Sequence, residues 1–196
     1  HFQTVHHDIW NYDNPTAPSL LDVTIDGETV PILVQTTKQS FAYVLNRETG
    51  EPIWPIEERP VPESMIPSEQ TSPTQPFPTR PAAYEMQGVT VDDLIDFTPE
   101  LRQQAIENMS EYQMGPLFNP PLHRDNDLGK RSALLCPGGN GGTNIPGGTV
   151  TDPDTGILYT ATIKSCDAPL LVPGAEADLQ YENPTGTTLM EWASGA

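Results

Sequence analysis

Residues 20–54 read LLDVTIDGETVPILVQTTKQSFAYVLNRETGEPIW, and this stretch decides the fold. Every second residue from Leu21 to Ile25 is apolar and the residues between them are polar, which is the period of a half-buried strand. Asp26 and Gly27 follow, and this dipeptide supplies the positive φ angles of a tight hairpin turn. We therefore predict an antiparallel hairpin at the start of the stretch.

Two more strands are expected after the hairpin. Residues 30–35 and 41–45 are mostly apolar, and a polar turn at residues 37–40 separates them. A second turn at residues 46–50 leads to a short apolar segment that ends at Trp54. Parallel strands need long crossover connections, which this stretch lacks, so the pattern predicts an antiparallel meander.

Composition and charge limit the classes of function. The 196 residues include 9 Lys+Arg and 27 Asp+Glu, for a formal net charge of −18. A protein that binds nucleic acid needs cations to replace the counterions of the phosphates, so a nucleic-acid partner is excluded.

The 22 prolines and 15 glycines are typical of a turn-rich chain with few long helices. No apolar stretch approaches the roughly 20 residues of a membrane span, and the start lacks both Met and a leader pattern, so we expect a soluble fragment.

The middle of the chain contains a proline-rich stretch and a helix signal. Nine of the 22 prolines fall within residues 52–81. Because proline has no backbone N–H, we expect an extended surface excursion there, with little strand pairing. Thr98, Pro99 and Glu100 combine an N-cap hydroxyl, a proline at the first helical position and an acid in the first turn. This pattern predicts a short helix that ends near Tyr112.

Short strands are expected again after the helix, at residues 133–136, 149–151 and 157–163. The glycine-rich segment CPGGNGGTNIPGG, residues 136–148, separates the first from the second. Glycine permits positive φ and close backbone approach, and the segment lacks the following Lys-Ser/Thr of a phosphate-binding loop.

The chain has two cysteines, Cys136 and Cys166, which flank neighbouring strands of this prediction. In an oxidising compartment they could form a disulfide, or each could serve as a small buried hydrophobic residue. The sequence leaves both possibilities open.

Several segments carry a resemblance to a known family. LNRETGEPIW (residues 45–54) resembles the repeat signature of eight-bladed quinoprotein propellers, in which a Thr-Gly turn precedes a Trp that packs between blades. TDPDTGILYTATI (residues 151–163) resembles a blade-opening strand of the same family. QTVHHDIWNYDNPTAPSLLDV (residues 3–23) is similar to the HxxWDxD-type segment of pyrroloquinoline-quinone-dependent alcohol and sugar dehydrogenases, most of all the membrane-type glucose dehydrogenase branch. SPTQPF (residues 72–77) and FNPP (residues 118–121) match the next features of that branch, in order.

The resemblance implies an all-β fold that is part of an eight-bladed quinoprotein β-propeller with four-stranded antiparallel blades. The chain is then a fragment of a single propeller domain, residues 1–196. Its expected parts are blade segments at about 1–54 and 132–172, a proline-rich and helical insertion at about 55–131, and an acidic tail at 173–196. The remaining blades are expected to lie outside this chain.

The resemblance also implies an enzyme that oxidises an alcohol or sugar hydroxyl with pyrroloquinoline quinone (PQQ) and calcium. Such enzymes pass electrons to ubiquinone or a cytochrome and work in the periplasm, and membrane association is implied for the full-length protein. The acidic surface would suit a basic electron acceptor by electrostatic steering. The alternative is a non-catalytic propeller segment that serves as a scaffold or binding module.

The resemblance places the catalytic base at a position that this chain has changed. In the family, a carboxylate just after the Trp of the opening motif accepts the substrate's hydroxyl proton and helps to hold calcium, but the residue here is Asn11. An amide cannot accept that proton at neutral pH, so Asp8 or Asp13 supplies the base, the branch works differently, or catalysis has been lost. Asn11 can still offer an oxygen to calcium. Without the resemblance, Asp8 and Asp13 are interpreted as solvated turn acids.

Three other residues are predicted to bind the cofactor. Lys38 falls where the family has a Lys or Arg that bonds the quinone's carbonyl oxygens and stabilises the negative charge that develops there. By itself, a lysine in a polar turn would be expected to be exposed. Asn144 aligns with an Asn that hydrogen-bonds the cofactor, and Asn140 is the neighbouring alternative. We therefore expect Asn11, Lys38 and Asn144 to lie on one side of the fold.

Overall fold

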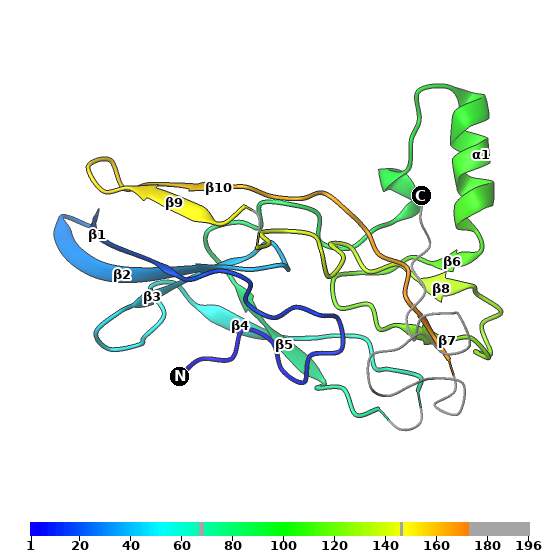
Figure 1. The fold of residues 1–196 in the computed structure, drawn as a ribbon, viewed down its shortest axis with the longest axis horizontal. Coiled ribbons are helices and arrows are strands. Elements are labelled where there is room, and N and C mark those ends of the chain that lie inside the picture. The colour runs from blue at the N-terminus through cyan, green and yellow to red at the C-terminus, as the bar shows by residue number, and fades with distance from the viewer. Residues whose placement is uncertain (67–68, 146, 173–196) are drawn as a thin grey trace.

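The computed structural model describes residues 1–66, 69–145 and 147–172 (Figure 1). These residues form one three-stranded sheet, four pairs of short strands and a single α-helix. The all-β fold class is therefore confirmed. The elements in chain order are β1 Ser19–Ile25, β2 Glu28–Thr36, β3 Ala42–Asn46, β4 Ile56–Pro60, β5 Thr74–Pro78, the 3-10 helix η1 Val91–Asp93, α1 Pro99–Met109, β6 Tyr112–Gln113, β7 Leu122–His123, β8 Ser132–Ala133, β9 Thr149–Asp152, β10 Ile157–Thr160 and β11 Leu170–Leu171.

The predicted hairpin and meander are confirmed by the sheet β1–β2–β3. Both neighbouring pairs are antiparallel, and the β1–β2 register closes with Ile25 opposite Glu28. Asp26 and Gly27 form the turn with φ angles of 52° and 86°, as the sequence pattern requires.

The four-stranded blade expected from residues 20–54 is not confirmed, because this sheet has three strands. The segment that should supply a fourth strand makes only an isolated bridge, between Leu45 and Pro52. The residues on either side of Pro52 make the two hydrogen bonds of this bridge, from Asn46 N–H to Glu51 O (2.8 Å) and from Ile53 N–H to Val44 O (2.9 Å), and the pairing extends no further. Trp54 is half-buried and packs against the apolar side chains of the sheet instead.

The later strands also differ from a four-stranded blade. β9 and β10 form the expected antiparallel hairpin, and its turn closes with a hydrogen bond from Gly156 N–H to Asp152 O (2.9 Å). This hairpin lies beside β1 and contributes Leu158 to the same apolar cluster (Figure 1). β8, which we expected to pair with them, runs parallel to β6 instead.

The proline-rich stretch is more ordered than the sequence predicts, because β4 and β5 pair antiparallel within it. The donors are at odd-numbered positions: Val61 N–H donates to Pro73 O and Thr79 N–H donates to Pro55 O. Alternate residues of a strand point their N–H groups to opposite sides. At the even-numbered prolines 60, 76 and 78 the backbone nitrogen therefore points away from the partner strand, so its missing N–H costs no hydrogen bond between β4 and β5. The expectation of little strand pairing in this stretch was wrong.

The predicted helix forms, but it ends early. Thr98 caps α1 by accepting a hydrogen bond from Leu101 N–H. The helix ends at Met109 rather than near Tyr112, because Ser110 N–H bonds Glu107 O and tightens the last turn. Tyr112 belongs to β6. Figure 1 shows α1 standing to one side of the strands, outside them as predicted.

Three clusters of buried apolar side chains hold the elements together. The first cluster unites segments that are distant in sequence, since Phe118 packs edge-on against both Trp10 (5.1 Å between ring centroids) and Phe77 (5.6 Å). The opening, SPTQPF and FNPP segments therefore meet in one aromatic core. The members are Trp10, Tyr12, Phe41, Tyr43, Leu117, Phe118 and Leu135; then Leu21, Ile32, Val34, Ala42 and Val44; then Val89, Met109, Leu134, Cys136 and Ala168.

The structure decides the question that the two cysteines left open. Cys136 and Cys166 form a disulfide, with their Cα atoms 4.5 Å apart. The bond joins the start of the glycine-rich segment to the chain that follows β10.

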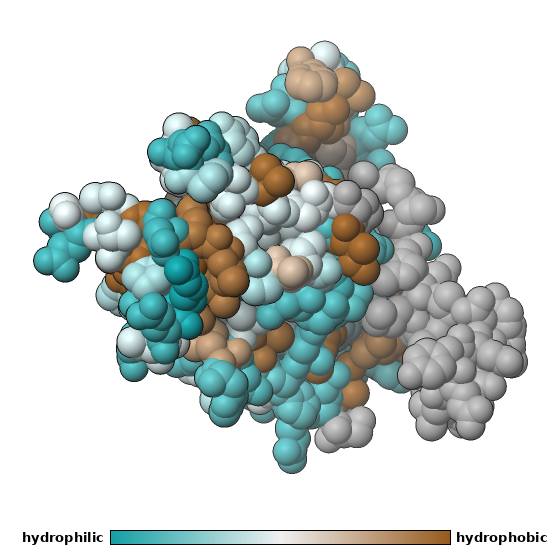
Figure 2. All heavy atoms as spheres, turned by 60° about the vertical axis from the view of Figure 1, so that its left-hand side comes forward, coloured by the Kyte–Doolittle hydropathy of each residue, from teal (hydrophilic) through white to brown (hydrophobic). Residues whose placement is uncertain are grey.

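The outer surface is mixed in character. On the face in Figure 2, apolar patches lie among hydrophilic and neutral surface. The exposed apolar side chains include Val150, Ile157 and Tyr159 of the β9–β10 hairpin. Within the described ranges no helix is long and apolar enough to cross a bilayer. The predicted acidic tail, residues 173–196, lies outside the described residues.

Candidate functional site

Two buried aromatic residues hold the Asn11 loop in place. Trp10 donates its indole N–H to Asn119 O (2.9 Å), and Tyr12 donates its hydroxyl to Pro137 O (2.6 Å). Both rings are almost completely buried. Between them, Asn11 adopts a positive φ of 64° and is exposed. The aromatic anchors therefore present Asn11 at the surface of the core.

Asp8 shapes the same loop from within. Its Oδ1 accepts a hydrogen bond from Trp10 N–H (2.8 Å) and its Oδ2 accepts one from Tyr12 N–H (2.7 Å). Burial raises the pKa of this carboxyl, while the two N–H groups and the charge of Lys38 act in the opposite direction. Both oxygens of Asp8 thus take part in the turn that leads to Asn11.

The polar turn at residues 37–40 is buried, although its composition suggests a surface turn. Thr37, Gln39 and Ser40 are 0% exposed, and Lys38 is 6% exposed. Tyr84 closes over the turn by donating to Thr37 O (2.9 Å) and accepting from Thr37 N–H (3.2 Å). Lys38 is therefore enclosed. The family resemblance implies this burial, whereas the polar composition of the turn predicts an exposed lysine.

The ammonium group of Lys38 reaches the Asn11 loop. Its Nζ donates to Asn11 O (3.0 Å), to Asn11 Oδ1 (3.3 Å) and to Asp13 Oδ1 (2.5 Å). The side chain of Asp13 is 61% exposed, so the ion pair is buried on the lysine side and open to water on the carboxylate side. A cation held in this way can exchange its carboxylate partner for an anionic ligand.

The glycine-rich segment packs directly on these two groups. A Cβ atom added to Gly142 would lie 2.2 Å from Lys38 O, and Gly142 has a φ of +59°. A Cβ atom added to Gly139 would lie 2.8 Å from Asn11 Nδ2. Only glycine permits such close approach of the backbone, so the glycines at these two positions are needed to hold Asn11 and Lys38 in place.

Of the two predicted asparagines, the structure buries Asn144 and leaves the Asn140 side chain exposed. Asn144 is 8% exposed, and its Oδ1 accepts a hydrogen bond from Ile145 N–H (2.7 Å). Its neighbour Thr143 donates its N–H to Thr37 O (3.2 Å), next to Lys38. Asn11, Lys38 and the segment that carries Asn144 therefore converge, although more than a hundred residues separate the first from the last.

Two residues near the site carry no sequence signal that would have identified them. Tyr84 shares a hydrogen bond with Thr143 (2.8 Å), so its hydroxyl joins the lysine turn to the glycine-rich segment, and burial raises its pKa. Asp167 lies behind the same segment. Tyr84 follows a proline-rich stretch and Asp167 follows a cysteine, and neither context indicates a role.

The residues present fit an anionic quinone better than they fit calcium. Lys38 supplies an enclosed cation, which suits the carboxylates and carbonyls of such a cofactor. The oxygens of Asn11 and Asp13 that could bind calcium already accept hydrogen bonds from Lys38. The described ranges contain no cluster of three or more His, Cys, Asp or Glu residues that could hold a metal ion.

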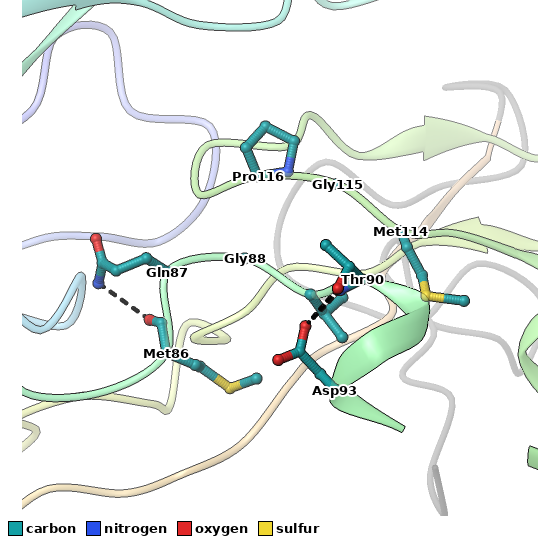
Figure 3. A pocket seen from close by; sticks show the side chains of 9 residues that line it. Met86, Gln87, Gly88, Thr90, Asp93, Met114, Gly115 and Pro116 are labelled. Carbon is teal, nitrogen blue, oxygen red and sulfur yellow. Dashed lines mark hydrogen bonds between the residues drawn. The ribbon is translucent and has the colours of Figure 1, made fainter. Parts of the chain in front are cut away.

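An open hollow of about 680 Å³ lies elsewhere (Figure 3). Thr90 and Asp93 in its wall bond to each other, as Figure 3 shows. Its other lining residues are Met86, Gln87, Gly88, Val89, Met114, Gly115 and Pro116. Its polar side chains already bond within the protein, Gln87 to Gln39 O (2.7 Å) and Thr90 to Asp93 (2.9 Å), so we place the candidate site at Lys38 instead.

Comparisons with known proteins agree on one family. The family model described as "PQQ: Glucose/ethanol/alcohol dehydrogenase, beta-propeller domain" matches residues 1–193. The chain is 32% identical over 218 residues to the quinoprotein glucose dehydrogenase of Escherichia coli (strain K12), covering 98% of this chain and 25% of the relative. It is 35% identical over 159 residues to the glycerol dehydrogenase large subunit of Gluconobacter thailandicus, covering 80% and 20%. It is 33% identical over 159 residues to a probable quinate dehydrogenase (quinone) of Xanthomonas campestris pv. juglandis, covering 81% and 19%.

The chain thus spans a quarter or less of the length of these relatives. No solved structure matches it significantly.

Proposed function

This chain belongs to the PQQ-dependent glucose/ethanol/alcohol dehydrogenase family, and from that membership we propose that it is part of an enzyme that oxidises an alcohol or sugar hydroxyl. The observation that carries the proposal is the enclosed Lys38 ammonium group, which meets Asn11 and Asp13 under the glycine-rich segment. A buried lysine in a polar turn needs such partners to be stable. A turn that only connected two strands would not need a buried cation.

PQQ, when bound, supplies the electrophilic carbonyl that accepts the two electrons of the substrate. In this proposal Lys38 provides positive charge where negative charge develops, in a place from which most water is excluded. Gly139 and Gly142 keep Asn11 and Lys38 at fixed positions, and fixed positions lower the entropic cost of the reaction. Asn144, which is enclosed beside the lysine turn, is the proposed hydrogen-bonding partner of the cofactor. Asn140 is less suitable because its side chain is exposed.

The proton of the substrate hydroxyl requires a base, and we propose Asp13 for this role. Asn11 has no basic group at neutral pH, and both oxygens of Asp8 accept backbone hydrogen bonds. Asp13 is mostly exposed and lies against Lys38, so a substrate can approach its carboxylate. Asp8 would then act only by shaping the loop.

Calcium stays a prediction of the resemblance, with Asn11 as its proposed ligand in this chain. The described residues do not form a metal site by themselves, so further ligands would have to come from outside them. We derive no step through calcium.

The proposed electron acceptor is ubiquinone or a cytochrome, and the proposed location is the periplasm, with membrane association of the full-length protein. The name of one relative specifies a quinone acceptor. The disulfide between Cys136 and Cys166 supports an oxidising compartment, where such bonds persist. The net charge of −18 would favour a basic acceptor surface.

The test is a PQQ titration and an alcohol and sugar oxidation assay of the full-length protein with three variants. Asp13→Asn should lower kcat by about a hundredfold or more, because general-base catalysis contributes that much. Asp26→Asn, in an exposed turn, is the matched control and should keep full activity. Asn11→Asp restores the carboxylate of the family and should keep or raise activity. Unchanged kcat in Asp13→Asn would contradict the role of Asp13, and absence of PQQ binding would contradict the whole proposal.

A second candidate function is a non-catalytic propeller scaffold, and Asn11 is the observation that favours it. In that case the wild type should bind no PQQ, or bind it without turnover of any alcohol or sugar.

A further inference from the structure

Asp167 lies on a strand-like segment that runs along the back of the glycine-rich segment. Leu135 and Asp167 exchange two backbone hydrogen bonds (2.8 and 2.9 Å). Gly142 and Ile163 exchange another pair (3.0 and 2.9 Å). The disulfide of Cys166 fixes the position next to Asp167. The backbone of Asp167 is therefore held firmly beside the glycine-rich segment.

The carboxylate of Asp167 touches that segment closely. A Cβ atom added to Gly138 would lie 2.1 Å from Asp167 Oδ2, so the position next to the carboxylate must be glycine. Burial raises the pKa of Asp167, and the backbone N–H groups of Asn140 and Gly139 favour its ionised form. The carboxylate thus faces three consecutive residues of the segment.

One oxygen of this carboxylate has no partner in the described part of the chain. Its Oδ2 is buried without a hydrogen-bond partner among the residues that the structure describes. A buried carboxylate oxygen without a partner is destabilising, so an acid at this position calls for a reason other than core stability.

The other side of the same segment faces the candidate site. Gly139 approaches Asn11 Nδ2, and Asn11 in turn accepts a hydrogen bond from Lys38. A single thickness of backbone therefore separates Asp167 from the Asn11 and Lys38 pair. A displacement of this backbone towards Asn11 would therefore press on its side chain.

We propose that Asp167 is a positioning residue, whose carboxylate fixes the path of residues 138–140 and thereby holds Asn11 against Lys38. It does not need to touch substrate or cofactor. The consequence for catalysis rests on the proposed function, but the effect on the backbone does not.

The first test measures hydrogen exchange of the Gly139 and Asn140 amides in the full chain. Asp167→Ala should speed their exchange by about tenfold or more, because the segment then opens locally at a lower free-energy cost. Asp167→Asn keeps the shape and should have a smaller effect. Asp127→Asn removes the same charge from an exposed loop and is the control. Rates that are unchanged in both Asp167 variants would overturn the proposal.

The second test measures PQQ affinity and steady-state kinetics of the full-length protein. Asp167→Ala should weaken PQQ binding by about tenfold, and Asp167→Asn should recover part of that loss. Asp127→Asn should match the wild type. If the wild type binds no PQQ, the proposed function fails while the exchange experiment still decides the role of Asp167. If exchange rises but PQQ affinity and kcat stay unchanged, the positioning role at the site is overturned.

Discussion

Two polar turns lie at the two ends of β3, and they have opposite environments. The turn at residues 37–40 is almost completely buried, whereas residues 47–50 of the following turn are exposed. Both are rich in polar side chains, and both contain a basic residue, Lys38 or Arg47. The polar composition of a turn therefore does not show whether the turn lies at the surface or is buried in the candidate site.

The difference between them comes from distant parts of the chain. The exposed turn satisfies itself, since Asn46 Oδ1 accepts hydrogen bonds from Glu48 N–H (2.9 Å) and Thr49 N–H (3.1 Å). The buried turn is covered by Tyr84 and by the glycine-rich segment. The turn at residues 37–40 is thus buried by parts of the chain that are distant in sequence.

The largest effect should come from a glycine that contacts the buried turn. In Gly142→Ala the new Cβ would meet Lys38 O at a positive φ, and backbone must move to avoid it. We expect a loss of about 3 to 5 kcal/mol in the free energy of unfolding. Gly50→Ala, in the exposed turn, also has a positive φ but meets nothing within 4 Å, so about 1 kcal/mol is expected. Urea denaturation of both variants tests the difference, and equal losses would contradict it.

Reducing the disulfide should come next. The bond closes a loop of 30 residues, which corresponds to about 3.6 kcal/mol in the chain-entropy account. Because the bond clamps the glycine-rich segment, reduction should raise hydrogen exchange in residues 37–40 more than in residues 47–50. Cys136→Ser with Cys166→Ser should reproduce the result without reductant. Equal changes in the two turns would show that the clamp does not control the buried one.

The two basic residues should differ less, but measurably. Lys38→Met keeps most of the buried side-chain volume and removes the charge that bonds Asn11 and Asp13, so about 1 to 2 kcal/mol should be lost. Arg47→Met removes an ion pair with Asp22 at the surface, and about 0.5 kcal/mol is expected. In the full-length protein only Lys38→Met should also reduce turnover. Equal losses of stability in the two variants would contradict the difference between the two turns.

The smallest effect concerns pH. Burial raises the pKa of Asp167 above its ordinary value of 3.8, so the folded state binds the proton more tightly than the unfolded state does. The contribution of Asp167 to stability should therefore increase as pH falls through its folded pKa towards 3.8. Relative to Asp167→Asn, the wild type should gain less than about 1 kcal/mol between pH 7 and pH 4, because the group is partly screened by water. A wild type that loses stability relative to the variant over this range would contradict the sign.

The sequence by itself determined the local elements. Asp26 and Gly27 fixed the β1–β2 hairpin, and Thr98 fixed the start of α1, because each signal acts on backbone groups within a few residues. The family resemblance also predicted Asn11, Lys38 and Asn144 as a group. The structure brings Asn11, Lys38 and the segment that carries Asn144 together, while their chemical roles stay predictions.

Only the tertiary structure decided which polar segments are buried and which strands pair. The pairing of β4 with β5 depended on the parity of Pro76 and Pro78 relative to a partner strand, which no local pattern contains. The disulfide depended on how the chain after β10 returns to Cys136. Tyr84 and Asp167 acquired their places in the same way. Burial and contact are properties of two surfaces that meet, so a segment's own composition cannot specify them.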